Sequence, residues 1–252
     1  MDFKRVHSLM REYKRLSKNF IDVEKYSYYA ITHHSTSIEG STLKEKEVIN
    51  LLEYGMGSKK PFEHQLMVSD HHKALMFVLE TAKEKKPITV DFIQQINAKV
   101  MQNTGKTYFT ALGDFDSSKG ELRLFSVRAG NRTFPDYKKL PKLLKDFCEQ
   151  TSQELKKARS TEKKLLLSFK AHFDLVSIHP FADGNGRTSR LLMNYIQAYF
   201  NLPLSIVFLE NRMEYIEALE KSRKDDELTP LYEFMLRQYE KFLRKEIKLL
   251  KS

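Results

Sequence analysis

Apolar residues recur every three or four positions along most of this chain, which is the period of an amphipathic helix. The repeat is clear near the start, at Leu9, Tyr13 and Leu16. Residues that commonly begin helices precede later repeats, as at Ser41–Thr42 and Thr89. The pattern predicts helices over residues 6–38, 42–55, 66–86, 89–100, 138–155, 161–178, 188–200, 212–223 and 229–250.

Residues 104–136 break the helical pattern, because they are rich in Gly, Thr, Ser and Asp. Within them, Leu122–Val127 has β-favouring residues with partial alternation, and Gly130–Asn131 is a plausible turn. Thr133–Phe134 can then pair back before Pro135. The sequence therefore predicts a mainly α fold with one small β-hairpin over residues 122–134, and we find no internal repeat.

Composition narrows the class of protein. Of 252 residues, 41% are hydrophobic and 30% charged, with only 9 Gly and 7 Pro, which excludes collagen-like and Pro/Gly-rich disordered chains. No run approaches the roughly 18 apolar residues of a membrane-spanning helix. The first residues lack the apolar core and cleavage site of a secretion signal. Because the one cysteine, Cys148, cannot form an intrachain disulfide, we expect a soluble, cytoplasmic protein.

The chain is basic, with a net charge of +10 and an isoelectric point near 9.4. Such a charge is compatible with nucleic acid, a membrane surface or a phosphate-bearing ligand. The lysines and arginines are scattered, however, and none of their short runs reaches five residues. We therefore interpret them mainly as solvated helix faces.

One segment, His179–Arg190 with the sequence HPFADGNGRTSR, carries an unusual density of reactive groups. It lies between two apolar helical repeats, so it predicts a tight loop leading into a helix N-terminus. Gly184–Asn185–Gly186 can expose backbone N–H groups there, which with the helix N-terminus form an anion cradle. Arg187 and Arg190 lie three positions apart on one helix face, and two guanidinium groups beside such a cradle suit a polyphosphate.

Two further residues of the segment suggest a reaction. Asp183 is a natural oxygen ligand for Mg²⁺, which usually takes one or two carboxylates plus substrate phosphates. His179 can act as a base near neutral pH. The segment has neither the Rossmann nor the Walker A glycine pattern. A zinc site of His172, Asp174, His179 and Asp183 is conceivable, but phosphates plus one carboxylate suit magnesium better. His172 lies on an apolar stripe, where packing is the expected role.

The twelve residues match, without departure, the signature of the Fic-domain family, His-x-Phe-x-(Asp/Glu)-Gly-Asn-Gly-Arg-x-x-Arg. The resemblance covers roughly residues 30 to 225 and is strongest over 165–200. It implies a multi-helix Fic-type bundle with a β-hairpin, called the flap, near the active site. It divides the chain into an N-terminal helical segment (1–85), a catalytic core (86–225) and a C-terminal helix (226–252).

The resemblance implies adenylylation, the transfer of AMP from ATP to a Ser, Thr or Tyr hydroxyl of a protein. In the family, the residue matching His179 deprotonates the target hydroxyl, and Phe181 anchors the loop. Asp183 holds Mg²⁺, for which Mn²⁺ can substitute. The phosphate-binding residues implied are Gly184, Asn185, Gly186, Arg187, Thr188 and Arg190.

The resemblance also implies two contacts outside the loop. Family members hold the target as an added strand along the flap, which here falls at Ser126, Val127, Arg128, Ala129 and Gly130. Tyr215 falls where the family often places an aromatic residue near the adenine, although a tyrosine at this helical position is also typical of a core.

A second family feature lies upstream, where Ser35–Gly40 (STSIEG) resembles the inhibitory motif Ser/Thr-x-x-x-Glu-Gly/Asn. It implies that Glu39, with Ser35 one turn before it, restrains the enzyme by pairing with Arg190. The same carboxylate could orient a water that removes AMP again. Taken alone, Glu39 before Gly40 would be only a helix end. We expect His33 and His34 to be exposed or capping side chains.

Two other functions stay open at this stage. A Fic-type loop can transfer a different group, such as UMP, phosphate or phosphocholine. A basic nucleic-acid-binding regulator is the alternative from another class, and we consider it less favoured because the charge is scattered. The expected partner is a protein substrate, the chain itself included, with no membrane partner. The sequence does not identify that substrate or the oligomeric state.

Overall fold

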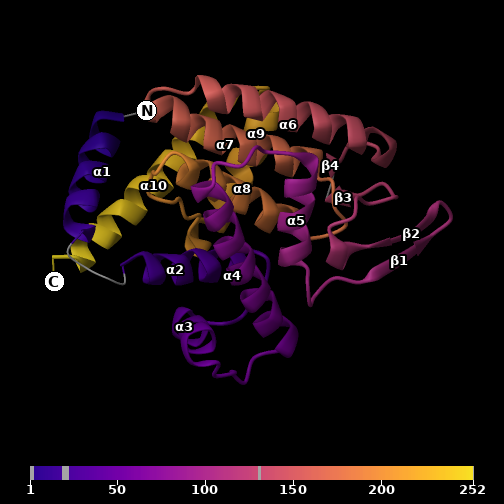
Figure 1. The fold of residues 1–252 in the computed structure, drawn as a ribbon, viewed down its shortest axis with the longest axis horizontal. Coiled ribbons are helices and arrows are strands. Elements are labelled where there is room, and N and C mark those ends of the chain that lie inside the picture. Colours follow the sequence, from indigo (N-terminus) through magenta and orange to yellow (C-terminus); the bar gives the residue numbers. More distant parts are fainter. Residues whose placement is uncertain (1–2, 19–22, 130–131, 252) are drawn as a thin grey trace.

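Helix α8 (Asn185–Tyr199) runs through the centre of the molecule, and the other long helices are arranged around it (Figure 1). The computed structural model describes residues 3–18, 23–129 and 132–251. Every residue of α8 from Arg187 to Gln197 is buried, which is typical of a helix enclosed on all sides. It packs against α7 (Thr161–Ile178) on one side and α4 (Phe62–Lys83) on another.

The remaining helices form a shell around this centre. Helix α5 (Val90–Val100) packs on α4 and α8, α6 (Leu140–Lys157) packs on α7, and α9 (Arg212–Lys224) packs on α10 (Thr229–Leu249). Helix α1 (Phe3–Ser17) packs along α10. One continuous apolar cluster joins these helices. No helix of the described part is long and apolar enough to cross a membrane.

Helix α2 (Val23–Ile38) is buried along its C-terminal half even though that half is rich in histidine, serine and threonine. It lies between α4, α8 and the short helix α3 (Glu45–Tyr54), so these polar groups must find partners inside the protein. His33 and His34 are only 9% and 8% exposed, so of the two roles predicted for them, exposed or capping, exposure was wrong. His34 Nδ1 instead accepts a hydrogen bond from the backbone N–H of Leu209 at 3.2 Å.

Two antiparallel hairpins lie between α5 and α6 in the sequence. The first pairs β1 (Thr107–Thr110) with β2 (Gly113–Asp116), and the second pairs β3 (Arg128–Ala129) with β4 (Arg132–Thr133). The sequence predicted only the second hairpin, and the first strand that it predicted, residues 122–127, does not match β3. Residues 122–127 are not in a strand, because the segment is held by other bonds described below. The predicted turn Gly130–Asn131 lies outside the described residues.

Several helix boundaries differ from the predicted ones for local reasons. The predicted helix over 6–38 is two helices, α1 and α2. Helix α3 begins at Glu45 rather than after Thr42, since the Glu47 carboxylate caps the Lys44 N–H at 2.9 Å. Helix α8 begins at Asn185, so most of the glycine-rich segment is the first turn of the helix rather than a loop before it. The predicted cap at Thr89 is confirmed by its bond from the Phe92 N–H.

Candidate active site

The segment 179–184 is a short connection between α7 and α8, and hydrogen bonds with the start of α8 hold it in one conformation. Phe181 is fully buried and anchors it. The Asn185 side chain bonds both backbone groups of Phe181, with Oδ1 accepting at 3.0 Å and Nδ2 donating at 2.9 Å. Gly184 has φ of +76°, a conformation that glycine adopts without strain. These features fix the N-terminus of α8 relative to the C-terminus of α7.

His179 ends α7 in a left-handed conformation, with φ 53° and ψ 58°. Its ring stacks on Phe134, just after β4, with centroids 3.8 Å apart. Nδ1 lies 3.4 Å from the Val176 carbonyl oxygen, an acceptor that favours the proton on Nδ1 and leaves Nε2 as the basic atom. Burial lowers the pKa of His179 to about 4. The imidazole is therefore neutral at physiological pH and can accept a proton.

The first turn of α8 has backbone N–H groups without helical partners, which is the basis of an anion site. The carboxylate of Glu39 lies directly against this turn. A Cβ built on Gly186 would overlap the Glu39 Oε1 atom, so the position admits only glycine while that carboxylate is in place. An acidic group from α2's end thus lies beside the predicted phosphate cradle.

Arg187 and Arg190 are both nearly fully buried, and their side chains contact different helices. The two guanidinium groups, although three positions apart on α8, therefore have different hydrogen-bond partners. Arg187 turns toward α5, where its Nη1 lies 3.5 Å from the Val100 carbonyl oxygen, and its Nη2 lies 3.7 Å from Asp183 Oδ1. Its Nε has no partner among the described residues. Arg190 turns toward α2.

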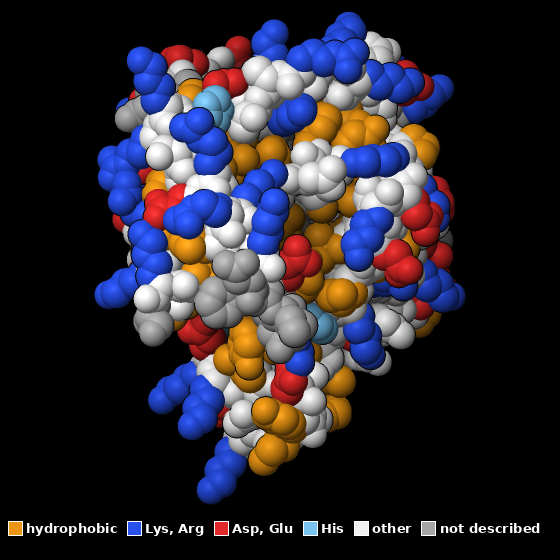
Figure 2. Space-filling model, turned by 60° about the vertical axis from the view of Figure 1, so that its left-hand side comes forward, with side chains coloured by type: hydrophobic (Ala, Val, Ile, Leu, Met, Phe, Trp, Pro, Cys, Tyr) orange, Lys and Arg blue, Asp and Glu red, His pale blue; other side chains and the backbone are white. Residues whose placement is uncertain are grey.

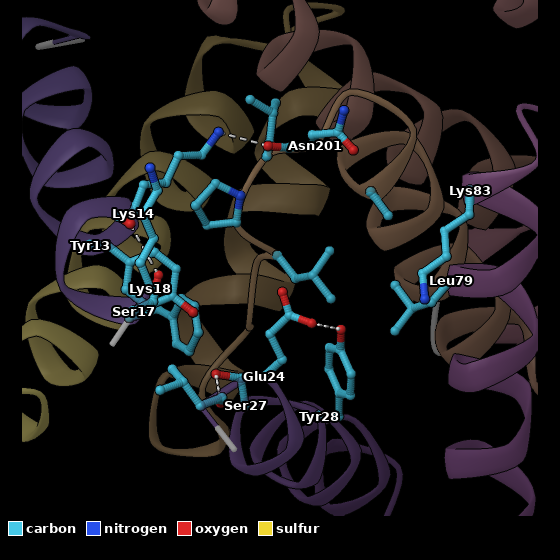
Figure 3. Close-up of a pocket in the computed structure, with 16 residues that line it drawn as sticks. Tyr13, Lys14, Ser17, Lys18, Glu24, Ser27, Tyr28, Leu79, Lys83 and Asn201 are labelled. Carbon is cyan, nitrogen blue, oxygen red and sulfur yellow. Dashed lines mark hydrogen bonds between the residues drawn. The ribbon is translucent and has the colours of Figure 1, made fainter. Parts of the chain in front are cut away.

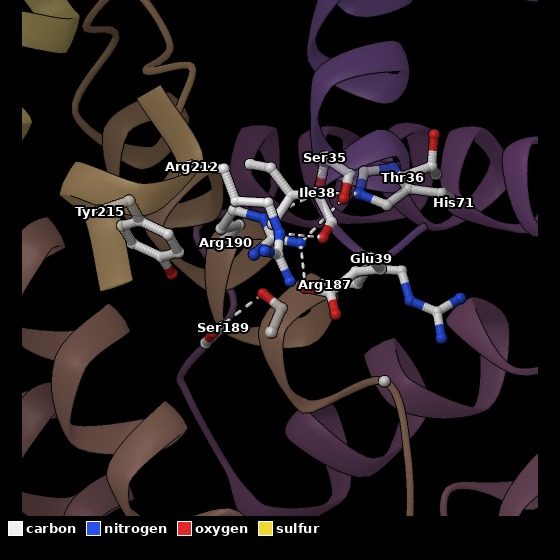
Figure 4. Close-up of polar contacts among 12 residues, drawn as sticks. Ser35, Thr36, Ile38, Glu39, His71, Arg187, Ser189, Arg190, Arg212 and Tyr215 are labelled. Atoms are coloured by element: carbon white, nitrogen blue, oxygen red, sulfur yellow. Dashed lines mark hydrogen bonds and ion pairs between the residues drawn. The ribbon is translucent and has the colours of Figure 1, made fainter. Parts of the chain in front are cut away.

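Arg190 is held by three contacts from the C-terminal part of α2 (Figure 4). Nε donates to Ser35 Oγ at 2.9 Å, and Nη2 donates to the Ser35 carbonyl oxygen at 2.9 Å and to Glu39 Oε1 at 2.8 Å. Burial alone would raise the pKa of Glu39, but the Arg190 guanidinium, with smaller contributions from Arg187 and Arg212, holds that pKa below its usual value. Glu39 and Arg190 therefore form a charged pair.

His71 of α4 supports this pair from behind. Its Nε2 lies 2.7 Å from Ser35 Oγ. Because a guanidinium can only donate, Ser35 Oγ accepts from Arg190, and this leaves the hydroxyl proton of Ser35 available to a His71 ring that is unprotonated at Nε2. Burial lowers the pKa of His71 well below its ordinary value, which agrees with a neutral acceptor.

Asp183 presents the carboxylate expected to hold a metal. Its side chain is 63% exposed beside the α8 N-terminus, and Asn97 Nδ2 donates to its carbonyl oxygen at 3.1 Å. A single exposed carboxylate fits an ion that takes its other ligands from phosphates and water, as Mg²⁺ does. Within the described ranges, no group of three or more His, Cys, Asp and Glu side chains could hold a metal ion. The zinc alternative therefore has no cluster to support it there.

Two predicted nucleotide contacts are buried in the core. Thr188 is fully buried, and its Oγ1 accepts from Asn97 Nδ2 at 3.1 Å. Tyr215 is 4% exposed, and its hydroxyl lies 2.7 Å from His172 Nε2, so it has the packing environment that the core alternative expects. The packing role expected for His172 fits its complete burial.

The flap residues lie close to His179. The Val127 carbonyl oxygen accepts from the Phe134 N–H at 3.2 Å, which extends the β3–β4 pairing by one bond. Ser126 and Arg128 are exposed on this hairpin. Gly130 lies outside the described residues.

Three residues near the site were missed by the sequence reasoning: Asn97, Arg123 and Phe134. Asn97 interrupts the apolar stripe of the 89–100 helix, and Arg123 interrupts the apolar run 122–127. A polar residue on a predicted buried face was the available signal for both. Phe134 had none, because its contact with His179 depends on how the chain folds back.

A separate hollow opens on another face, between α1, α2, α4 and α10, and apolar side chains are visible within it (Figure 2). Its volume is about 450 Å³, and Lys14, Lys18 and Lys83 are among the residues that line it (Figure 3). Its lining contains no residue of the 179–190 segment and not Glu39. Over the face in Figure 2, basic side chains are spread with acidic ones among them rather than gathered in one patch.

The chain is similar to known proteins over almost its whole length. Residues 87–197 match the sequence model of the Fic/DOC family. Protein adenylyltransferase fic-1 of Caenorhabditis elegans is 29% identical over 98% of this chain and 47% of that protein. Protein adenylyltransferase Fic of Drosophila melanogaster is 29% identical over 87% of this chain and 42% of that protein. The chain thus spans about half the length of these curated relatives, or less.

Solved structures confirm the predicted fold class. A Fic-domain-containing signaling protein from Bacteroides thetaiotaomicron has a TM-score of 0.84 at 20% identity, covering 98% of this chain and 97% of that one. Fic-1 of Caenorhabditis elegans has a TM-score of 0.77 at 24% identity, covering 98% of this chain and 72% of that one. The mainly α bundle with a small hairpin beside the signature segment is a Fic fold.

Proposed function

We propose that this chain, whose residues 87–197 form a Fic/DOC domain, is a protein adenylyltransferase that transfers AMP from ATP to a protein hydroxyl. The observation that carries the proposal is the arrangement of His179, Asp183 and Arg190 around one helix N-terminus. Relatives at 28–29% identity that are named protein adenylyltransferases support it.

The phosphates of ATP would bind at the first turn of α8, where free N–H groups and the positive end of the helix dipole favour negative charge. Arg187 and Arg190 would neutralise the phosphates of the leaving pyrophosphate. Asp183 would hold Mg²⁺, or Mn²⁺ in its place, and the ion would supply charge neutralisation for the phosphates. Positioning and charge neutralisation are the main contributions that such a transfer needs.

The transfer itself requires one base. The target hydroxyl oxygen bonds to the α-phosphorus, the bond from the α-phosphorus to the bridging oxygen breaks, and pyrophosphate leaves. His179 Nε2 takes the hydroxyl proton in this step. Its neutral state and its buried, stacked ring are what a positioned base requires.

Glu39 would keep the enzyme inhibited in the state described. It occupies the Nη2 group that a terminal phosphate would need, and it brings negative charge to the phosphate cradle. ATP could then bind only in a pose unsuited to attack on the α-phosphorus. Displaced slightly, the same carboxylate could orient a water for removal of AMP.

The substrate would be a protein whose strand adds along the flap at 126–130, this chain included. Transfer of another phosphate-containing group is the alternative within the same site. The presence of Asp183 together with both arginines favours a nucleoside triphosphate whose leaving pyrophosphate lies against Arg187 and Arg190. The cytoplasmic location stays a prediction from the sequence.

Mass spectrometry of the intact chain after incubation with Mg²⁺ and ATP tests the proposal. We expect a population heavier by one AMP, larger in a Glu39→Gly variant, and absent in EDTA until Mg²⁺ or Mn²⁺ is restored. Asp183→Ala should lose both the modification and most of the metal-dependent ATP affinity, because the ion joins the protein to the phosphates. Undiminished modification in EDTA would refute the metal's role, and an added phosphate in place of AMP would refute the transferase proposed here.

A further inference from the structure

Arg123 is an almost completely buried arginine just ahead of the flap, with 1% of its surface exposed. Its side chain donates to three backbone carbonyl oxygens: Nε to His179 at 2.9 Å, Nη1 to Phe125 at 2.6 Å and Nη2 to Pro135 at 2.7 Å. Its own backbone N–H donates to the Pro180 carbonyl oxygen at 3.1 Å. One residue thus bonds three separate segments of the chain.

The environment of Arg123 is unusual for a buried charge. It forms no ion pair with a described carboxylate, and burial lowers its pKa, which the more distant Asp136 only partly offsets. Burying a cation against neutral carbonyls is costly. The planar guanidinium presents its donors in a rigid fork, so that three different nitrogens reach the three carbonyl oxygens, whereas a lysine ammonium carries its donors on one nitrogen at the end of a flexible stem. These bonds therefore depend on the arginine's shape and not on its charge alone.

The segments that Arg123 joins are the two parts of the proposed active site. His179 and Pro180 belong to the signature loop, while Phe125 precedes β3 and Pro135 follows β4. The guanidinium therefore ties both ends of the flap to the loop that carries the base. Phe134 adds a ring contact between the same two parts.

Arg123 also acts on a strained part of the backbone. His179 has a positive φ of 53°, a left-handed conformation that is unfavourable for a non-glycine residue. The carbonyl groups of His179 and Pro180 follow a helix C-terminus, where no helical N–H is available to them. Arg123 provides a donor to each. Arg123 thus stabilises, through these two hydrogen bonds, the left-handed turn that orients the His179 imidazole.

We propose that Arg123 is a positioning residue for AMP transfer, which holds the His179 imidazole and the target-docking edge of the flap at a fixed separation. This inference rests on the proposed function. It places the effect of Arg123 on the acceptor side of the reaction, where hydroxyl and base must meet. ATP affinity would depend instead on the α8 N-terminus, and the hydrogen bonds of Arg123 to the described residues go to 125, 135, 179 and 180 and not to α8.

The test compares Arg123→Lys and Arg123→Met in a Glu39→Gly background. We expect the kcat of auto-adenylylation to fall about 100-fold in both, the loss that follows from a misplaced reacting group. The KM for ATP should stay within about twofold. Leu243→Ala, at a fully buried position of α10, is the control for stability lost away from the site.

The inference would be wrong if Arg123→Lys kept the kcat of the Glu39→Gly parent. It would also be wrong if Leu243→Ala lost as much kcat at equal stability, or if a rise in the KM for ATP accounted for the whole effect. Hydrogen exchange separates this inference from the proposed function. In Arg123→Lys, the amides of 125–129 and 132–134 should exchange faster, while those of α8 should not. If Glu39→Gly transfers no AMP, the proposed function fails, and unchanged flap exchange would independently refute the role of Arg123.

Discussion

The His179 imidazole is neutral in the folded chain because burial lowers its pKa to about 4. Two positive neighbours, Arg123 and Arg132, lower that pKa further, while Glu39 raises it. The imidazole is thus in the unprotonated state that the proposed base requires over the whole physiological range. Its ring is fixed by Phe134 on one face and by the backbone turn beneath it.

Replacing His179 by alanine should lower the rate of AMP transfer by about 10² to 10⁴, the usual contribution of a general base. ATP affinity should hardly change, because the cradle and Arg190 remain. In the parent enzyme, kcat/KM should be level above about pH 5 and fall as the pH drops through about 4, since protonated imidazole cannot act as a base. Single-turnover rates and ATP titrations measure both. A His179→Ala variant that transfers AMP at the parent rate would remove His179 from the mechanism.

Single residues of the site were predictable where they are contiguous in the sequence. His179, Asp183 and Arg190 lie within twelve positions, so their chemistry is visible in one segment. Arg123 lies 56 positions before His179 and reaches it only through the fold. The same applies to His71, which meets Ser35 across two helices.

At the scale of elements, the end of α2 lies against the first turns of α8, and the regulation we propose depends on that contact. Arg190 also donates from Nε to Ser35 Oγ, a bond that does not involve Glu39, so we expect its guanidinium to stay in place when the carboxylate is removed. The Nη2 group that Glu39 occupies would then be available to a phosphate.

Glu39→Gly should therefore raise auto-adenylylation by about tenfold or more, the effect of losing one charged hydrogen bond. Glu39→Asp, one methylene shorter, should release the inhibition only partly. Combining Glu39→Gly with Arg190→Ala should abolish the increase in auto-adenylylation, because the increase depends on Arg190 being free to bind a phosphate. Quantitative mass spectrometry of the modified fraction over time measures each rate.

The matched control is Glu24→Gly, which removes a carboxylate from the other end of α2, where it bonds Tyr28. This variant should leave auto-adenylylation unchanged. Equal activation by Glu24→Gly would mean that loosening α2 is enough. If Glu39→Gly were modified only at the parent level, Glu39 would not be inhibitory and would be only a carboxylate at a helix end.

Elements with a strong apolar period were predicted well. The predicted helix 161–178 has the observed bounds, because Ser160 caps it and its apolar residues repeat evenly. The β1–β2 hairpin was missed, since its stabilising contacts are the stacked Tyr108 and Phe115 rings in a segment otherwise rich in turn residues. A hairpin of four-residue strands has too little pattern to be recognised.

At the scale of the molecule, the candidate site forms because the fold packs the end of α2 against α8 around one core. Glu39, which directly follows α2, and Arg190 of α8 are 151 positions apart in the sequence. The sequence identified both motifs through their resemblance to a family. Neither periodicity nor composition could place one against the other. The charge of +10, which suggested nucleic acid as an alternative partner, is spread with acidic residues among the basic ones on the face in Figure 2.

The central claim is that the group transferred to protein is AMP from ATP. The most direct measurement is incubation of the Glu39→Gly variant with Mg²⁺ and ATP labelled on either the α- or the γ-phosphorus, with the label on protein read after separation. The account predicts label on protein from α-labelled ATP and none from γ-labelled ATP. Label from the γ-position alone would indicate a kinase and contradict the account, as would ATP that binds without placing either label on protein.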